Sequence, residues 1–169
     1  MIITGNVWKF PQDDINTDQI RAYMYSHLPV EEQAKHCLET LDPEFAERVK
    51  PGDIVVAGRN FGCGSSRPAH ATFVALGVSA IIAESFGRLF FRHTISAGRF
   101  ALPVPGILDL VQNGDRIEID TDTSVIRNLA NEQRNGRSSL DFKPLPPFLA
   151  GMVDAGGEFE YLKRRLGRA

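Results

Sequence analysis

The sequence predicts an α/β protein with a parallel core, additional β segments and C-terminal helices, and three observations lead there. Between residues 53 and 103, short apolar runs that suit buried strands alternate with stretches of helical composition. Glycines and prolines separate these runs. After residue 114 the pattern changes to short alternating runs, and two helical stretches end the chain. The strand–helix–strand order favours parallel strands, because each helix carries the chain back across the sheet.

The elements before the core are expected in this order: a strand at 2–10, a polar loop at 13–20, a mobile loop at 21–29, a helix at 31–41 and a short helical turn at 43–49. The helix at 31–41 is predicted because Ala34, Cys37, Leu38 and Leu41 fall on one face at helical spacing.

The predicted core runs from a turn at Pro51-Gly52 to residue 103. Its members are a strand at 53–57, a helix at 69–76, a strand at 78–83, a helix at 86–97 and a strand at 100–103. Pro68 suits the first turn of a helix, and Gly77 and Gly98 suit the two helix ends. The later elements are expected as β segments at 115–120, 123–129 and 140–142 and helices at 146–155 and 158–166.

Length and charge limit the functional classes. A chain of 169 residues is expected to form a single domain spanning 1–169. Its net charge of −2 gives no electrostatic basis for binding nucleic acid. No apolar run approaches the roughly 20 residues of a membrane span. The start of the chain lacks the apolar core of a signal peptide, and with two lone thiols this predicts a cytoplasmic protein.

No metal site is expected within this chain. Cys37 and Cys63 do not form a Cys-x-x-Cys pair, and the four histidines show no ligand spacing. Asp13, Asp14 and Asp18 form an acidic group, but their spacing does not match a calcium loop. The sequence therefore predicts neither a metal ion nor a cofactor bound by these residues.

The segment at 58–67, Gly-Arg-Asn-Phe-Gly-Cys-Gly-Ser-Ser-Arg, is the most informative part of the sequence and is called the signature loop below. Its glycines, Gly64 among them, allow the backbone to approach a ligand closely. Ser65 and Ser66 add hydroxyls, and Arg67 adds a planar fork that matches a carboxylate. An apolar stretch that reads as a helix follows, and helix N-termini attract anions. We expect this loop to bind a small di- or tricarboxylate.

Other glycine-rich motifs do not match. A P-loop requires Lys after its last glycine, where Ser65 stands, and the dinucleotide fingerprint requires a third Gly, where Arg67 stands. The nucleophile elbow of hydrolases also fails around both serines, which leaves a stand-alone serine hydrolase as a weak alternative. The structural alternative is a glycine turn whose serines only cap the next helix.

Three segments together resemble one known family: Asp14-Ile15-Asn16-Thr17-Asp18-Gln19-Ile20, the signature loop, and Ala83-Glu84-Ser85-Phe86-Gly87-Arg88-Leu89-Phe90-Phe91-Arg92. In residue type, order and spacing they resemble the small subunits of 3-isopropylmalate dehydratase. Those subunits correspond to the swivel domain of the aconitase superfamily. The resemblance covers roughly residues 1–112 and implies an aconitase swivel-like fold.

The family's chemistry is dehydration and rehydration of a hydroxy di- or tricarboxylate. The resemblance implies a partner, a large subunit whose [4Fe–4S] cluster binds the substrate hydroxyl, and no cofactor in this chain. It implies that Ser65 is the base that removes the substrate proton. It also implies that Ser66 and Arg67 contact the substrate carboxylate, and that Thr17 and Asp18 line the cleft. The chain alone is therefore expected to be inactive.

Two departures from the family pattern bear on the substrate. Pro68 and Ala69 follow the signature Arg, where members usually have Glu and then His or Gln. Tyr25 lies in the loop that sets specificity and offers no positive charge for a third carboxylate, which favours an apolar branch as in isopropylmalate or dimethylmalate. Arg21 is near enough to keep homoaconitate or citrate as alternatives. A non-catalytic carboxylate-binding module is the alternative from another class.

Overall fold

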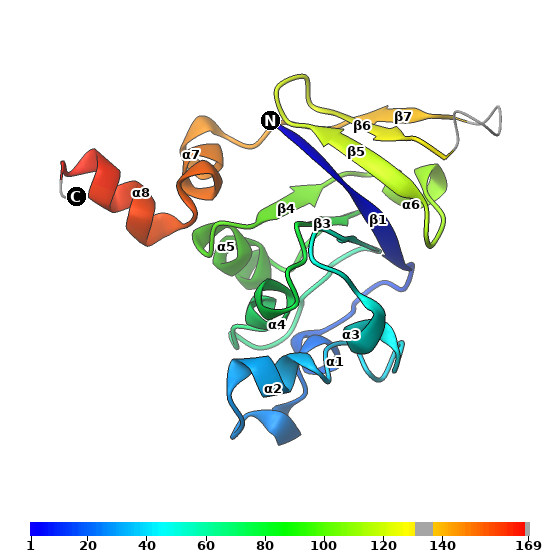
Figure 1. Cartoon of the computed structure of the whole chain (residues 1–169), viewed down its shortest axis with the longest axis vertical. Coiled ribbons are helices and arrows are strands. Elements are labelled where there is room, and N and C mark those ends of the chain that lie inside the picture. The colour runs from blue at the N-terminus through cyan, green and yellow to red at the C-terminus, as the bar shows by residue number, and fades with distance from the viewer. Residues whose placement is uncertain (131–136, 168–169) are drawn as a thin grey trace.

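The computed structural model describes residues 1–130 and 137–167. In this part of the chain one mixed sheet has the strand order β4-β3-β2-β1-β5-β6-β7 (Figure 1). Its strands are β1 (Ile2–Phe10), β2 (Ile54–Ala57), β3 (Ala80–Ala83), β4 (Phe100–Pro103), β5 (Arg116–Asp120), β6 (Val125–Asn128) and β7 (Ser139–Asp141).

The predicted parallel core is confirmed, and β1 joins it to the additional β segments. β1, β2, β3 and β4 pair in parallel. The first half of β1 pairs antiparallel with β5, while its second half, from Val7 to Phe10, pairs with β2. The long strand β1 therefore belongs to both halves of the sheet.

β2, β3 and β4 are apolar along their whole length, as suits strands whose two faces are both covered. Every residue of β2 is buried, as expected for a central parallel strand. Ile54 and Val56 pack into one hydrophobic core, whereas Val55 and Ala57 pack into a second core on the opposite face. This two-residue alternation places one core under β5–β7 and the C-terminal helices, and the other under the helices that precede β4.

The helices of the described residues are α1 (Thr17–Ile20), α2 (Val30–Ala34), α3 (Phe45–Arg48), α4 (His70–Ala75), α5 (Arg88–Ser96), α6 (Ile107–Leu110), α7 (Pro147–Ala155) and α8 (Glu158–Arg165). A 3-10 turn spans Tyr23–Tyr25. α7 and α8 lie beyond α5, on the side away from α1 (Figure 1). No helix in the described ranges is both long and apolar enough to cross a bilayer.

Three local expectations were wrong. The helix expected at 31–41 ends at Ala34, and Leu38 takes a left-handed φ of 57° that a helix does not permit. Cys37 and Leu38 are buried nonetheless, so the apolar residues were assigned correctly to the core but not to one helix. α1 lies inside the expected polar loop, and α6 was not expected at all.

Buried aromatic rings fix the start of the signature loop to the core. Phe61 is fully buried, with Phe90 edge-on at a centroid distance of 5.3 Å and Phe73 at 6.1 Å. Phe45 extends the cluster from α3 through edge-on contacts to Phe10 and Phe73. Such pairs add about 0.5–1.5 kcal/mol each beyond their burial, so the loop leaves the core from a rigid base.

Candidate active site

The signature loop leaves the C-terminal end of β2 and is closely packed against its neighbours, at the edge where ligands usually bind parallel sheets. The amide of Gly62 donates to the Ile15 carbonyl at 2.7 Å, and the amide of Gly87 donates to the Phe61 carbonyl at 2.8 Å. Gly62 has a φ of 75°, and a Cβ there would lie 2.2 Å from the Phe90 ring. Only glycine fits that position.

A capped helix brings Thr17 to this loop. Asn16 caps α1 by accepting from the amides of Asp18 and Gln19, while the Gln19 side chain accepts from the Asn16 amide. This fixes the buried Thr17, whose amide donates to the Cys63 carbonyl at 2.9 Å. The sequence Asn-Thr-Asp-Gln therefore forms the second wall of the site.

The hydroxyls of Thr17 and Ser65 meet at this junction. Their oxygens are 3.0 Å apart, and the Ser65 amide donates to Thr17 Oγ1 at 3.2 Å. Either hydroxyl can donate in this contact, and Thr17 can donate to Ser65 Oγ while it accepts the amide proton, because a hydroxyl has one proton and two lone pairs.

Arg67 supplies two more donors to the same oxygen. Its Nε donates to Ser65 Oγ at 3.0 Å, and its amide lies 3.4 Å from that oxygen. The far end of the guanidinium pairs with the Asp18 carboxylate, and Arg67 Cζ lies over the Tyr23 ring, 5.3 Å from its centroid. Ser65 Oγ is thus set among donors from Thr17 and Arg67, one of them charged.

A small hollow of about 180 Å³ adjoins Arg67 and is also lined by Arg21. Arg21 donates to the Gln33 side chain and, at 3.0 Å, to the Pro68 carbonyl. Partial burial, and then the nearby charge of Arg67, lower the pKa of Arg21. Two guanidinium groups beside one hollow attract an anion. The sequence reasoning considered Arg21 only as a reason to keep tricarboxylate substrates, and it assigned no part in the site to Tyr23.

Most of the candidate residues come together as described above, namely Ser65, Arg67, Thr17 and Asp18. Gly64 lies beside them with a φ of 100°, and a Cβ added there would be 3.4 Å from Thr17 Oγ1. Ser66 is exposed on the same loop.

Tyr25 points elsewhere. Its ring stacks on His36 with centroids 3.7 Å apart, and a hydrogen bond to Glu39 raises its pKa. Tyr25 therefore ties the 3-10 turn to the segment after α2 rather than contacting Ser65.

The helix after the loop begins later than expected. α4 starts at His70 with Ala69 as its N-cap, and no side chain caps it. The serines therefore do not cap this helix, which was the structural alternative for them. Positive potential at Ser65 comes from Arg67 instead.

Next to this loop, the His70 ring lies beside the His93 ring, with centroids 5.8 Å apart. Burial, and then the nearby charges of His93 and Arg21, lower the pKa of His70 to about 4.

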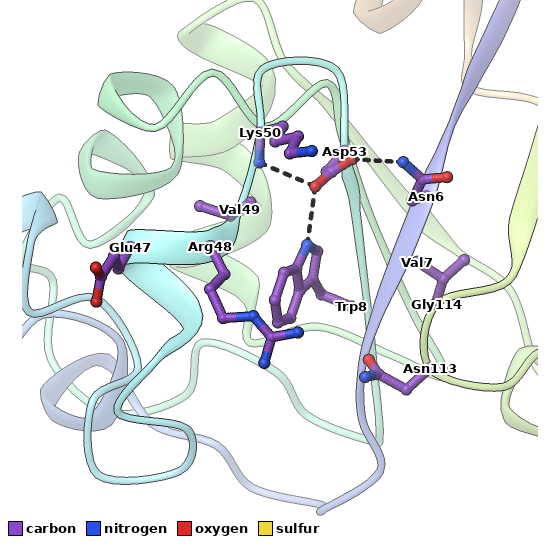
Figure 2. Close-up of a pocket in the computed structure, with 10 residues that line it drawn as sticks. All are labelled: Asn6, Val7, Trp8, Glu47, Arg48, Val49, Lys50, Asp53, Asn113 and Gly114. Carbon is purple, nitrogen blue, oxygen red and sulfur yellow. Dashed lines mark hydrogen bonds between the residues drawn. The ribbon is translucent and has the colours of Figure 1, made fainter.

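A larger hollow of about 520 Å³ lies at the opposite end of β2 and contains none of the candidate residues (Figure 2). The buried Asp53 carboxylate accepts from Trp8 Nε1 at 2.9 Å, from the Lys50 amide at 2.9 Å and from Asn6 Nδ2 at 3.2 Å. Its oxygens are already engaged in joining β1 to β2.

Among residues 1–130 and 137–167, no three His, Cys, Asp or Glu side chains converge as a metal site.

Comparison with known proteins places these residues in a family. The model of the aconitase C-terminal domain matches residues 4–105. The 3-isopropylmalate dehydratase small subunit of Thermodesulfovibrio yellowstonii is 44% identical, with 98% of this chain and 96% of the relative covered. The isopropylmalate/citramalate isomerase small subunit of Methanocaldococcus jannaschii is 39% identical, with 99% and 98% covered.

A solved structure agrees with the sequence comparisons. The crystal structure of 3-isopropylmalate dehydratase from Methanocaldococcus jannaschii superposes with a TM-score of 0.88 at 36% identity, covering 98% of this chain and 96% of that chain. The swivel-like fold inferred from the signature loop and its neighbours is thereby confirmed, and the chain belongs to the family of 3-isopropylmalate dehydratase small subunits, built on the aconitase C-terminal domain.

Proposed function

We propose that this chain is the small subunit of a 3-isopropylmalate dehydratase, a hydro-lyase that isomerises a 2-hydroxy dicarboxylate by dehydration and rehydration. The observation that carries the proposal is the convergence of Thr17 and Arg67 on the Ser65 hydroxyl. The names of relatives that match nearly the whole chain support the reaction and the substrate class. We further propose that residues 1–169 act as one swivel-type domain in the cytoplasm, bound to a large subunit.

In this reaction Ser65 Oγ accepts a proton from the substrate carbon during dehydration and returns it during rehydration. A neutral serine hydroxyl is a poor base, so the oxygen must carry negative charge before it accepts the proton. Donors fixed in advance stabilise such a charge most strongly where water is excluded. Thr17 Oγ1 and Arg67 Nε, each 3.0 Å from Ser65 Oγ, occupy that role.

The [4Fe–4S] cluster of this chemistry does not fit the present chain. Such clusters are usually held by four Cys thiolates, and the sequence has only Cys37 and Cys63. Cys37 is buried beside Thr72, and burial raises its pKa to about 12, which disfavours a thiolate. We therefore assign the cluster to the large subunit.

Arg67 is the proposed contact for a substrate carboxylate, with Ser66 and the backbone at Gly64 beside it. In the chain alone, Asp18 occupies one side of the Arg67 fork. A bound carboxylate would replace Asp18 there, since both groups suit the same planar pair of donors. Pro68 stands where family members usually have Glu, so that carboxylate is missing; Ser65 orients Arg67 instead, joined by Asp18 while no substrate is bound.

An apolar branch on the substrate remains our preferred assignment, because relatives that match nearly the whole chain are named for isopropylmalate. The relative named as an isopropylmalate/citramalate isomerase supports substituted malates as a class. Dimethylmalate, which shares an apolar branch, is one alternative, and Arg21, beside Arg67 at the small hollow, keeps the tricarboxylates homoaconitate and citrate as others. Assays of the assembled enzyme on isopropylmalate, dimethylmalate, citrate and homocitrate test this, and turnover of only the last two would overturn the assignment.

The decisive experiment for catalysis is Ser65→Ala in the enzyme assembled with its large subunit, with Ser66→Ala on the same loop as the control. We expect Ser65→Ala to lower kcat by at least about 10³-fold and Ser66→Ala to act mainly on KM. Unchanged turnover with Ser65→Ala would favour the non-catalytic carboxylate-binding module.

A further inference from the structure

Gln33 of α2 is a buried polar residue at the small hollow beside Arg67, with only 3% of its surface exposed. Its amide oxygen accepts from Arg21 Nε, and its amide nitrogen donates to the Leu28 carbonyl. Because a guanidinium only donates and a carbonyl only accepts, these two contacts fix which end of the amide faces Arg21. Burying an amide is costly unless its groups are paired, and both ends of this one are.

The place of Gln33 relative to the signature loop is set by packing. α2 packs against α4, the helix that follows the loop. Cys37 lies just after α2, and its Sγ meets Thr72 Oγ1 of α4 at 3.2 Å in the interior. The Gln33 amide side chain is therefore carried by a packed unit and not by a free surface loop.

Gln33 holds Arg21 against the signature loop. Arg21 Nη1 donates to the carbonyl of Pro68, the residue that follows Arg67. Gln33 and Pro68 take only part of the donor set of a guanidinium. No carboxylate within residues 1–130 and 137–167 pairs with Arg21, so its charge and its remaining donors are available to a ligand.

Arg21 and Arg67 place two positive charges at one hollow of about 180 Å³. Asp18 pairs with Arg67 alone. The other residues that line the hollow bring no charge, namely Ala22, Ser26, Gln33 and Pro68. Keeping two cations together is unfavourable until an anion lies between them, and the charge of Arg67 accordingly adds to partial burial in lowering the pKa of Arg21.

We propose that Arg21 binds the substrate carboxylate that Arg67 does not bind, and that Gln33 is the residue that positions Arg21 for it. The two guanidinium groups then form a clamp for two carboxylates of one small acid, since each fork matches a carboxylate in shape and charge. An acid with a single carboxylate engages only one of them. The identity of the acid rests on the proposed function, whereas the clamp depends only on residues of this chain.

Binding of small acids to the free chain tests the clamp without catalysis. Succinate and acetate are the probes, and the NMR signals of the hydrogen-bonded Nε–H groups of Arg21 and Arg67 report on each guanidinium. We expect succinate to bind at least about tenfold more tightly than acetate, and Arg21→Gln to remove most of that preference.

Arg48→Gln is the matched control, because Arg48 is exposed and lies at the larger hollow at the other end of β2. It should keep the wild-type preference for succinate. Equal affinities for the two acids in the wild type, or a preference that survives Arg21→Gln, would overturn the proposal.

Two variants of Gln33 test its positioning role. Gln33→Leu keeps the size of the side chain and removes both hydrogen bonds, while Gln33→Glu keeps an acceptor for Arg21 but neutralises its charge. Both should lose the preference for succinate, and a shift of the Arg67 Nε–H signal with acetate shows that each still folds. If the Glu variant, or a folded Leu variant, kept the wild-type preference, Gln33 would not position Arg21.

Kinetics of the assembled enzyme connect the clamp to the reaction. Arg21→Gln should raise KM for isopropylmalate by at least about tenfold and change kcat by less than about threefold, because Arg21 contacts a carboxylate away from Ser65. A fall in kcat at unchanged KM would contradict this role. An assembled enzyme inactive on isopropylmalate, with a free chain that still prefers succinate, would overturn the proposed function and support the clamp.

Discussion

A single oxygen, Ser65 Oγ, carries the proposed chemistry, and its environment depends on one residue near it in sequence and one residue far from it. Arg67 lies two positions away and donates through Nε, whereas Thr17 reaches the same oxygen from α1. A charge-assisted donor is roughly twice as strong as a neutral one, so Arg67 contributes the larger stabilisation. Thr17 contributes direction, because its burial and the hydrogen bond from its amide to the Cys63 carbonyl fix the position of its hydroxyl.

Thr17→Val tests that contribution, since it keeps the shape of the side chain and removes the donor. We expect kcat of the assembled enzyme to fall by about 10²-fold with little change in KM, the cost typical of one lost donor to a developing charge. Thr17→Ser keeps the hydroxyl and should retain most of the activity. Equal losses in the two variants would show that Thr17 acts through packing alone. Steady-state kinetics on isopropylmalate measure both.

His70 gives the chain a pH dependence of stability. Its pKa is lowered to about 4 in the folded state from an ordinary value near 6.5, so the unfolded chain binds more protons between these values. Stability due to neutral His70 is therefore complete above about pH 6.5 and is lost as the pH falls toward 4.

The loss should amount to about 1–2 kcal/mol, after the full linkage value is reduced for solvent screening of a partly exposed ring. Urea unfolding of the wild type and of His70→Gln from pH 4 to 7.5 measures it. The variant should have a flatter pH profile, and parallel profiles would assign the dependence to other groups.

At the scale of elements, the sequence predicted what depends on local pattern and missed what depends on contacts. β1 and β4 begin and end at the expected residues, because apolar runs between turns define them. The 31–41 helix was wrong, because Leu38 is buried through a turn with positive φ that apolar spacing cannot distinguish from a helix. α1 was missed although Asn16 and Gln19 form a capping box, a signal that was present in the sequence.

The signature loop depends on a close backbone contact, which Gly62→Ala tests. The new Cβ would meet the Phe90 ring at 2.2 Å and would impose strain at a φ of 75°. We expect a loss of about 3 kcal/mol or more in the free energy of unfolding. Gly52→Ala is the control, since its φ is 97° but nothing lies within 4 Å, and it should cost only about 1–2 kcal/mol. Equal losses in urea titrations would mean that the Phe90 contact contributes nothing.

For the whole molecule, the sequence indicated the parallel core and the residue types of the site but not how the parts meet. The sheet order depends on β1 pairing with both β2 and β5, which lie far apart in the chain. Thr17 and Ser65 are separated by 48 positions, and only the fold makes them neighbours. Tyr25 shows the converse, since a residue chosen from its place in a loop stacks on His36.

The site of the isolated chain is also open to water. Ser65 and Ser66 are exposed, and Arg67 is only partly covered. In contact with water the donors around Ser65 Oγ are weakened, because solvent competes for each of them. A second surface that closes over the loop would exclude that water and strengthen each interaction. The chain is therefore expected to be inactive alone, even with every one of its own residues in position.

This dependence predicts that an inactive small subunit competes with the active one. The Ser65→Ala chain lacks one exposed oxygen, so its fold and its contact with the large subunit should be unchanged. With Ser65→Ala in about ninefold excess over wild type and the large subunit limiting, activity should fall to about a tenth by mass action. Ser66→Ala mixed in the same way should leave far more activity. If Ser65→Ala did not reduce activity, the variant would not be assembling, and its inactivity could not then be attributed to the missing base. A proportional fall separates the chemical role of Ser65 from its structural one.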